Sequence, residues 1–416
     1  MAEPRPYEPP RITRLPFVAS TKHLPREISA AADLDDEIDA AALVRRFGSP
    51  LFVISERRLR HDFRAFLQAF ADPHLETRIA YSVKTNYLPA VCSILKEEGA
   101  WAEVVSGMEY ELARALGFPG RQIIFNGPHK TRDELERALA GGAIVNIDNF
   151  DELSLVEEIA TGLPRPARLG IRISFRFGAL GWTKFGFDDD NKDSQRALER
   201  IAGNRRLRLE LLHSHCGTFL LVEGIYAKAA ERLIRLAKRA RDLGLAPSMI
   251  DLGGGFPSGN DLRPEYDFPG GSSRSGNFWA PYAAEIRDRL HKARDLFGGR
   301  PRLVLEPGRA VVDAAVQLLC TVVAKKAIEG RTPAIIVDAG VNLVPTACYY
   351  NHGVNRAASG NGVQHGRHGA IDIYGPLCMQ TDRLRDQALL PPLEVGDILA
   401  ISHVGAYCHT QSMQFI

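Results

Sequence analysis

The stretch Arg78-Ile-Ala-Tyr-Ser-Val-Lys84-Thr-Asn86 places a single lysine at the end of a short apolar segment. The run Ile79 to Val83 predicts a buried strand, and Asn86 to Pro89 predicts the loop that ends it. An amine at such a position is partly desolvated, which lowers its pKa and favours the neutral form that attacks an aldehyde to give a Schiff base. A surface lysine just beyond a strand is the ordinary alternative, so the assignment depends on the motifs further along the chain.

From this stretch onward, short apolar strands alternate with helices that carry start signals. Ser106 with Glu109, and Thr131 with Glu134, have the spacing of capping boxes. The predicted strands are Ile79 to Val83, Ala102 to Val105, Gln122 to Asn126, Ile144 to Ile147, Arg168 to Ser174, Arg208 to His213, Met249 to Leu252 and Leu303 to Glu306. Eight strand and helix units over about 230 residues match the size of a parallel (β/α)8 barrel, and we predict that α/β fold. A doubly wound open sheet is the alternative that periodicity alone leaves open.

The segments on either side of the barrel lack its regular alternation of strand and helix patterns. Before it, we predict an irregular arm, a helix over 29–47, a strand over 50–54 and a helix that starts at Ser55. After Glu306, Val- and Ile-rich segments without long helical stripes predict a mostly β domain. We therefore divide the chain into an N-terminal arm and helix that pack with the β domain (1–48), a barrel (49–306) and a C-terminal β domain (307–416). Residues 261–276 have the composition of an insertion and 351–369 that of a long loop.

The composition is that of an ordinary globular protein. A net charge of +2 on 416 residues gives no reason to expect nucleic acid or an anionic membrane as a partner. The N-terminus lacks the apolar run of a signal peptide and no later stretch is long enough to span a bilayer, so we expect a cytoplasmic protein. The six cysteines form no CxxC pair, which indicates neither a zinc site nor a disulfide framework. His352, His365 and His368 lack helical metal-ligand spacing, and we predict no metal site.

Two loops at the expected carboxyl rim of the barrel have the character of phosphate sites. Three consecutive glycines, Gly253 to Gly255, follow the seventh strand, and their backbone N–H groups are able to close around a phosphate. Glu306-Pro-Gly-Arg309 follows the eighth strand and adds a guanidinium that binds phosphate oxygens. These are the two positions at which barrels of this type bind phosphate.

The sixth strand ends in His213-Ser-His215-Cys-Gly-Thr218. Two histidines at this spacing face one side of a strand, which permits a metal pair, but a third ligand is not evident. We favour one imidazole that stacks on a planar cofactor, and we expect the other to be a core histidine with satisfied hydrogen bonds. A Schiff-base lysine, a phosphate-binding turn, a stacking surface and a carboxylate together describe a pyridoxal 5′-phosphate (PLP) site, with Glu306 paired to the pyridine nitrogen.

Six ordered motifs resemble those of the ornithine/diaminopimelate/arginine decarboxylase family: YSVKTN, HSHCGT, DLGGGFP, EPGR, GPLCMQTD and GAYCHTQSM. The resemblance covers nearly the whole chain and implies an alanine racemase-like (fold type III) barrel, a C-terminal β domain and a PLP-dependent amino-acid decarboxylase, a carboxy-lyase. It implies that Lys84 forms the Schiff base, that His215 stacks on the ring and that Glu306 binds the ring nitrogen. The residues it assigns to the phosphate are Thr218, Gly253, Gly254, Gly255, Gly308, Arg309 and Tyr407. Glu103 stands where the family often has an aspartate near the cofactor.

The resemblance also implies a homodimer whose active sites are shared between subunits. Cys378 would cross the interface and act as the acid that protonates the substrate carbon after CO2 leaves. The ordinary role of a free cysteine is that of a small buried hydrophobe. Lys184 resembles a family lysine near the same interface, and we hypothesise that it pairs with Asp382 of the partner subunit.

The chain departs from the diaminopimelate decarboxylase pattern where the distal end of the substrate binds. That pattern has a Glu after the crossing cysteine and an Arg-Pro-x-x-Tyr segment, but here Met379 follows Cys378 and the segment reads Val344-Pro-Thr-Ala-Cys-Tyr349-Tyr. Two charged contacts, each worth on the order of a few kcal/mol when buried, are missing, which argues against diaminopimelate. Ornithine decarboxylases have an Asp after that cysteine, so a simple diamine precursor is also disfavoured. We predict a substrate whose distal part is uncharged, conjugated or linked to a carrier protein, as in siderophore or antibiotic pathways, with Arg356 as a replacement contact.

Three alternatives stay open from the sequence. One is diaminopimelate decarboxylase of lysine biosynthesis. A second is an amino-acid racemase on the same barrel, for which an Arg rather than Glu306 is expected against the ring nitrogen. The third is a non-catalytic relative that binds a partner protein, against which the presence of Lys84, Glu306 and Cys378 argues.

Overall fold

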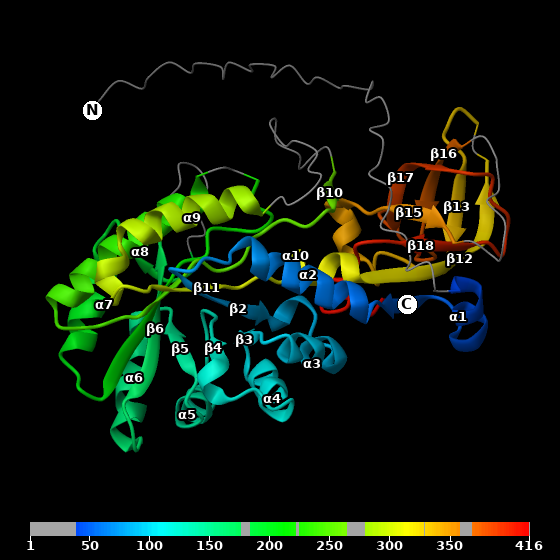
Figure 1. Ribbon diagram of the computed structural model, residues 1–416. Helices are drawn as coiled ribbons and strands as arrows, with labels where there is room; N and C mark the ends of the chain where they lie inside the picture. Colours follow the sequence, from blue (N-terminus) through cyan, green and yellow to red (C-terminus); the bar gives the residue numbers. More distant parts are fainter. Residues whose placement is uncertain are drawn as a thin grey trace, which may run out of the picture.

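The computed structural model describes residues 39–175, 184–221, 224–263, 279–327, 329–357 and 368–415. Eight of its strands form a closed parallel barrel (Figure 1). They are β2 (Glu76–Ser82), β3 (Trp101–Val104), β4 (Ile123–Phe125), β5 (Ile144–Ile147), β6 (Ala167–Ser174), β8 (Leu207–His213), β9 (Met249–Asp251) and β11 (Arg302–Leu305). Strand β5 pairs with β4 and β6, and β11 pairs with β2 and β9, which closes the ring. The predicted barrel is confirmed, and the doubly wound sheet is excluded because an open sheet would leave two edge strands.

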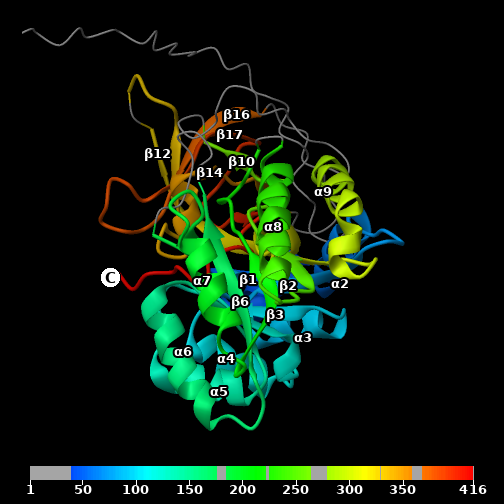
Figure 2. The same ribbon diagram turned by 90° about the vertical axis from the view of Figure 1, so that its left-hand side faces the viewer.

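Helices surround the barrel strands (Figure 2). They are α2 (Glu56–Ala69), α3 (Pro89–Glu97), α4 (Gly107–Ala115), α5 (Arg132–Ala140), α6 (Phe150–Gly162), α7 (Asp193–Ala202), α8 (Ile225–Asp242) and α9 (Ala280–Lys292), with the short α10 (Arg309–Val312) after β11. The predicted capping box at Thr131 and Glu134 is present. The one at Ser106 is only half formed, because the Glu109 carboxylate accepts the N–H of Val105, which precedes the cap.

The barrel interior is filled by one apolar layer. Ala80, Ile124, Ile144, Leu211, Met249 and Val304 form a buried cluster of their own, separate from the core between strands and helices. Side chains alternate along a strand, so residues two positions further along also point inward. This alternation decides which side chains reach the carboxyl rim.

A second sheet forms the C-terminal domain, at the right of Figure 1. Its strands, in spatial order, are β15 (Val354–Arg356), β18 (Ile398–Ile401), β12 (Val316–Lys326), β13 (Ala334–Val337), β16 (Gly369–Tyr374) and β17 (Arg383–Leu390). Strand β1 (Leu51–Ile54) also joins this sheet by pairing with β12, so the predicted barrel boundary at residue 49 is wrong. The chain passes through the β sheet before it enters the barrel at α2. Helix α1 (Ala40–Phe47) lies against this domain through Ala40, Leu319 and Ala400.

Three smaller elements complete the described fold. Strand β7 (Phe187–Asp188) pairs in parallel with the end of β6, and β10 (Asp261–Leu262) pairs with β14 (Tyr350–Asn351) across the two domains. The predicted arm, most of the predicted insertion and the middle of the predicted loop, including His365, lie outside the described residues. Within the described part of the chain, no helix is both long and apolar enough to cross a membrane.

Candidate active site

Each barrel strand places one buried polar side chain directly above the apolar layer. In strand order these residues are Ser82, Glu103, Asn126, Asn146, Arg172, His213, Asp251 and Glu306, and each is at most 9% exposed. Most of them follow an interior apolar residue by two positions, as Glu306 follows Val304. We call these eight residues the polar ring. They concentrate charge at the carboxyl end of the barrel, where active sites of this fold lie.

Lys84 lies at the ring, in the turn Val83–Thr85 that follows β2. Its Nζ is 2.6 Å from Glu103 Oε2, and the Ser82 hydroxyl donates to the same oxygen at 2.6 Å. Burial alone would lower the pKa of Lys84, but Glu103, Tyr407 and Glu306 outweigh burial and raise it. The prediction of a lowered pKa is therefore wrong for this state of the protein, because it did not include the carboxylate of the neighbouring strand.

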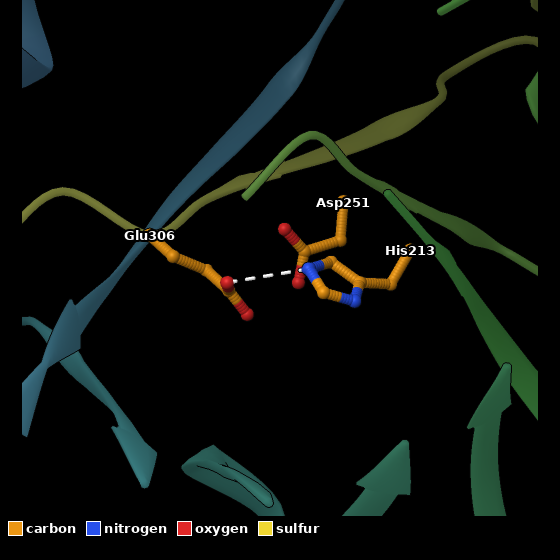
Figure 3. Close-up of side chains that lie close together, drawn as sticks. All are labelled: His213, Asp251 and Glu306. Atoms are coloured by element: carbon orange, nitrogen blue, oxygen red, sulfur yellow. Dashed lines mark ion pairs between the residues drawn. The ribbon is translucent and has the colours of Figure 1, made fainter. Parts of the chain in front are cut away.

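Glu306 lies beside His213 and Asp251, and the three side chains point toward one another (Figure 3). His213 Nε2 is 3.3 Å from Glu306 Oε2, and one ligand-type atom of each residue lies within 4.8 Å of the others. Burial would raise the pKa of Glu306, but His213 and Lys84 lower it well below its usual value. Burial and the neighbouring Glu306 raise the pKa of Asp251 well above its usual value. The site thus keeps one ionised carboxylate, Glu306, beside one that holds a proton.

His213 is not the satisfied core histidine that we predicted. It is 1% exposed, and neither of its ring nitrogens has a hydrogen-bond partner within the described residues. The two imidazoles, whose spacing would permit a metal pair, have different neighbours: His213 faces Glu306, whereas His215 faces the glycine turn.

His215 and the three-glycine turn form one unit. The N–H of Gly254 donates to His215 Nδ1 at 3.1 Å, which fixes the ring and leaves Nε2 as the protonated nitrogen of a neutral imidazole. Burial, with Arg172 nearby, lowers the pKa of His215 to about 3, so the ring is neutral at physiological pH. A Cβ on Gly253 would be 2.8 Å from His215 Nδ1, and one on Gly255 would be 2.3 Å from a backbone oxygen. Only glycine permits this close approach of turn and imidazole.

The second predicted phosphate loop meets both the lysine turn and the β domain. A Cβ on Gly308 would lie 1.9 Å from Thr85 Oγ1, and Tyr407 donates its N–H to the oxygen of Thr85 at 2.9 Å. Arg309 is 7% exposed, and its guanidinium lies 4.3 Å from the Tyr350 ring centroid and 5.3 Å from that of Tyr407. Four motifs that are far apart in sequence thus meet at one end of the barrel.

The chemistry of this site fits a PLP cofactor. Arg309 Nε and Thr85 Oγ1 are buried without a hydrogen-bond partner in the described part of the chain, and both lie where the two loops meet. The Arg309 guanidinium also pairs with Asp313, with Nη1 3.4 Å from Oδ2, while its Nε and the Thr85 hydroxyl suit an anion such as a phosphate. Lys84 supplies the amine, Glu306 an ionised carboxylate and His215 a flat neutral ring. Thr218, the further phosphate candidate, is exposed in the loop after β8.

Comparison with known proteins identifies the family. The model described as "Pyridoxal-dependent decarboxylase, pyridoxal binding domain" matches residues 56–313, which is more than half of the chain. The chain belongs to this family. It is a PLP-dependent amino-acid decarboxylase, a carboxy-lyase of the diaminopimelate/ornithine type.

Relatives of this decarboxylase match it over most of their length. It is 29% identical to the diaminopimelate decarboxylase of Bacillus subtilis (91% of this chain, 86% of the relative) and 30% identical to that of Aquifex aeolicus (90% and 85%). The solved diaminopimelate decarboxylase of Methanocaldococcus jannaschii, in complex with L-lysine, has a TM-score of 0.80 at 27% identity and covers 93% of this chain and 89% of that chain. A lysine/ornithine decarboxylase from Vibrio vulnificus, at 23% identity and a TM-score of 0.73, shares the fold.

The residues predicted at the subunit interface and around the substrate differ in their exposure. Cys378 is exposed and Lys184 is exposed, whereas Asp382 is 2% exposed and accepts the N–H groups of Val341 and Leu377 at 2.7 Å each. Both oxygens of Asp382 already accept an N–H inside its own subunit, and its pairing with Lys184 of the partner subunit stays a prediction. Tyr349 is half-buried, with its hydroxyl 3.5 Å from Gln411 Oε1.

Arg356, which we predicted as a replacement contact for the substrate, has an ion-pair partner within the β domain, and the substrate contact stays a prediction. Its guanidinium is 2.6 Å from Asp397 Oδ1, and both residues belong to the β domain. The ion pair joins the end of β15 to the segment before β18, so Arg356 serves the β sheet.

Five members of the polar ring were not identified as site residues from the sequence: Ser82, Asn126, Asn146, Arg172 and Asp251. Each lies within the last three residues of a predicted strand, and four of them follow an interior apolar residue by two positions. That spacing is the signal that could have found them once the barrel was accepted.

Proposed function

We propose that this enzyme decarboxylates an α-amino acid whose distal end differs from that of diaminopimelate. The observation that carries the proposal is the combination of a complete polar ring with an uncharged distal region. The catalytic centre would serve decarboxylation in general, and the residues around the distal end would select the substrate.

The polar ring supports a specific assignment of roles toward the cofactor. Bound PLP supplies an electron sink for the pair of electrons released when the substrate carboxylate leaves as CO2. Lys84 would carry the cofactor aldehyde, and Glu306, kept ionised by His213, would hold the pyridine nitrogen protonated. His215 would support the ring face, while Gly253 to Gly255, Gly308, Arg309, Tyr407 and Thr218 would bind the phosphate. Glu103 would hold the Lys84 amine in place between turnovers.

The distal region supports a substrate other than diaminopimelate. Val344, at the position of the family arginine, is 0% exposed and packs in the β-domain core. Met379, after the crossing cysteine, is half-buried and uncharged. A distal ammonium or carboxylate would lose its solvation without gaining a partner at either position, which costs on the order of a few kcal/mol. An uncharged, conjugated or carrier-linked distal group avoids that cost.

A shared active site in a homodimer remains part of the proposal. Cys378 is exposed on its own subunit, as a residue that serves a neighbouring site must be before assembly. Its thiol would donate a proton to the substrate Cα after CO2 leaves. Asp382 has no direct role in this scheme; by accepting the N–H of Leu377 it holds the loop that carries Cys378.

Diaminopimelate decarboxylase is the second candidate, because relatives that match about nine tenths of this chain carry that name. A racemase is disfavoured by the carboxylate of Glu306, since a protonated ring nitrogen strengthens the electron sink that decarboxylation uses.

One experiment tests both the role of Lys84 and the choice of substrate. Purified enzyme with PLP is screened for CO2 release from diaminopimelate, lysine, ornithine, arginine, glutamate and conjugated or carrier-linked amino acids, with Lys84→Ala as control. We expect a visible absorption band and CO2 release in the parent, fastest with a substrate other than diaminopimelate, and neither signal in Lys84→Ala. Fastest release from diaminopimelate would refute the substrate assignment alone. An unchanged band in Lys84→Ala would refute the role of the lysine.

A further inference from the structure

We propose that Asn126 is a positioning residue of the decarboxylation site, whose side-chain amide joins Glu103 and Glu306 and is itself oriented by Asn146. The inference rests on the proposed function for the roles of these two carboxylates. It concerns residues that lie beyond the lysine, histidine, glycine and arginine motifs.

Asn126 follows β4 and bridges Glu103 of the preceding strand, β3, to Glu306 at the end of the distant strand β11. Its Nδ2 donates to Glu103 Oε1 at 3.0 Å and to Glu306 Oε1 at 2.7 Å. Asn126 is 3% exposed, Glu103 1% and Glu306 4%, so water does not replace these bonds. One NH2 group thus holds a carboxylate from β3 beside a carboxylate from the end of β11.

The orientation of this amide follows from chemistry. Ionised carboxylates only accept hydrogen bonds, so the Asn126 nitrogen must face them and its oxygen must face away. Asn146 Nδ2 donates to Asn126 Oδ1 at 2.6 Å and blocks a flip of the amide. A Cβ on Gly170, the partner of Asn146 across β5 and β6, would lie 1.7 Å from Asn146 Oδ1. The glycine in β6 therefore makes the room that Asn146 needs.

The second oxygen of each carboxylate faces a different partner. Glu103 Oε2 is occupied by Ser82 and Lys84, and Glu306 Oε2 is directed at His213. Asn126 thus binds the one oxygen of each carboxylate that no other named partner binds. Two negative charges that share one donor in a buried site repel each other, and the hydrogen bonds from that donor offset part of the repulsion. Without the donor, the two carboxylate groups would move apart.

Several further charged groups face the carboxylate pair and enter any titration of the site. They are Lys84, Glu109, Arg172, His213 and Asp251, and Asp148 acts on Arg172 in turn. An extra negative charge at position 126 would be added to this set within reach of Lys84, and would favour protonated forms of the amine and of the carboxylates.

The test uses variants that differ in donor and charge, with PLP as the probe. Asn126→Asp replaces the donor with a third carboxylate, Asn126→Ser removes the donor without adding charge, and Asn146→Ser frees the amide to flip. Asn149→Ser is the control, because Asn149 caps α6 outside the ring and Ser is also a good cap. The readouts are the Kd for PLP, the pH midpoint of the visible band, and thermal unfolding of the cofactor-free protein as a function of pH.

We expect the Kd for PLP to rise about tenfold or more in both Asn126 variants, because charged hydrogen bonds contribute that order. In Asn126→Asp the midpoint of the band should move up by about one pH unit. The Tm of that variant should fall further below the parent as pH rises, because a carboxylate with a raised folded-state pKa loses its proton only at a cost. Asn146→Ser should change the Kd in the same direction by less.

Parent-like Kd and midpoint in Asn126→Asp would overturn the proposal. So would a variant that is less stable but binds PLP as the parent does, since Asn126 would then be structural only. If Asn126→Asp does not fold, Asn126→Ser and Asn146→Ser decide the question by the Kd. Failure of the parent itself to bind PLP would refute the proposed function, which is a separate outcome.

Discussion

His352 is an imidazole enclosed by residues of both domains. It is 1% exposed; its Nε2 lies 2.9 Å from Thr346 Oγ1, and its Nδ1 lies 3.2 Å from the oxygen of Ser402 and 3.3 Å from Asn260 Nδ2. Burial lowers the pKa of His352 to about 4. The folded-state pKa is thus below that of the unfolded chain, about 6.5, so the unfolded chain binds a proton first as the pH falls. The stability contribution of the neutral ring is present above pH 6.5 and is lost between about pH 6.5 and 4.

We therefore predict that His352→Gln reduces the dependence of stability on pH. The free energy of unfolding of the parent should fall between pH 7 and pH 4.5, with up to about 3 kcal/mol of that fall due to His352. Urea unfolding at both pH values measures the difference. His368→Gln, at an exposed position of the β domain, is the control. An equal fall in His352→Gln and in the parent would contradict the assignment.

For Lys84, the sequence predicts the position of the residue but not its pKa. Its position at the end of the first barrel strand is predictable from a local apolar run. Its pKa is not, because the dominant charge comes from Glu103 on the neighbouring strand, 2.6 Å away. The local sequence indicates that Lys84 is partly buried, but it does not indicate which charged residue lies beside the amine.

At the scale of elements, Glu134 joins the starts of two helices. Its carboxylate accepts the N–H of Thr131 at 2.8 Å and the N–H of Gly107, the first residue of α4, at 2.7 Å. A Cβ on Gly107 would be 2.4 Å from Glu134 Oε1, which explains the glycine at the start of that helix. One side chain thus ties neighbouring helices of the barrel together.

We predict that Glu134→Ala lowers the free energy of unfolding by about 1 to 2 kcal/mol, because two helix N-termini lose an acceptor. The matched control is Glu136→Ala, two residues along α5, where only an exposed ion pair with Arg132 is lost. That variant should stay within about 0.5 kcal/mol of the parent. If urea unfolding shows the same decrease in the free energy of unfolding for both variants, the two N–H bonds of Glu134 do not stabilise the fold more than the exposed ion pair does.

The barrel strands themselves were predictable to within a few residues. Short apolar runs bounded by helix caps locate them, and inward alternation places a polar residue above the apolar layer. What failed at this scale was β1: a run of four apolar residues does not reveal whether its partner is a barrel strand or β12, which begins 262 residues after β1 ends.

For the whole molecule, the β domain completes the active site. Gly405 accepts from Asn86 Nδ2 at 3.0 Å and Tyr407 donates to Thr85 at 2.9 Å, so the turn that carries Lys84 is held from both domains. Arg309 lies against Tyr350 and Tyr407, which both follow the barrel in sequence. Separation of the domains would therefore remove the support of the phosphate loop.

The proposed shared site makes a quantitative prediction for mixed subunits. Lys84→Ala and Cys378→Ala are each expected to lose most CO2 release, while Cys378→Ala keeps the visible band and diverts some turnovers to an aldehyde product. Random exchange of the two variants should restore up to about one quarter of parent sites, because half of the dimers are mixed and each has one intact site. CO2 release after refolding the mixture measures this. No recovery would show that each site is built from one chain.

The sequence alone determined the barrel, the separate β domain and the identity of the lysine, glycine and arginine loops, because strand period, helix caps and close-approach glycines are local properties of the chain. Only the tertiary structure decided which charges meet. Glu103 meets Lys84, and Asn126 bridges two carboxylates, through contacts between residues that are 19 to 180 positions apart in the chain. Asp382 likewise accepts the N–H of Val341 within its own subunit. Electrostatic energy depends on separation in space and on burial, and neither can be obtained from the order of residues until the barrel has closed.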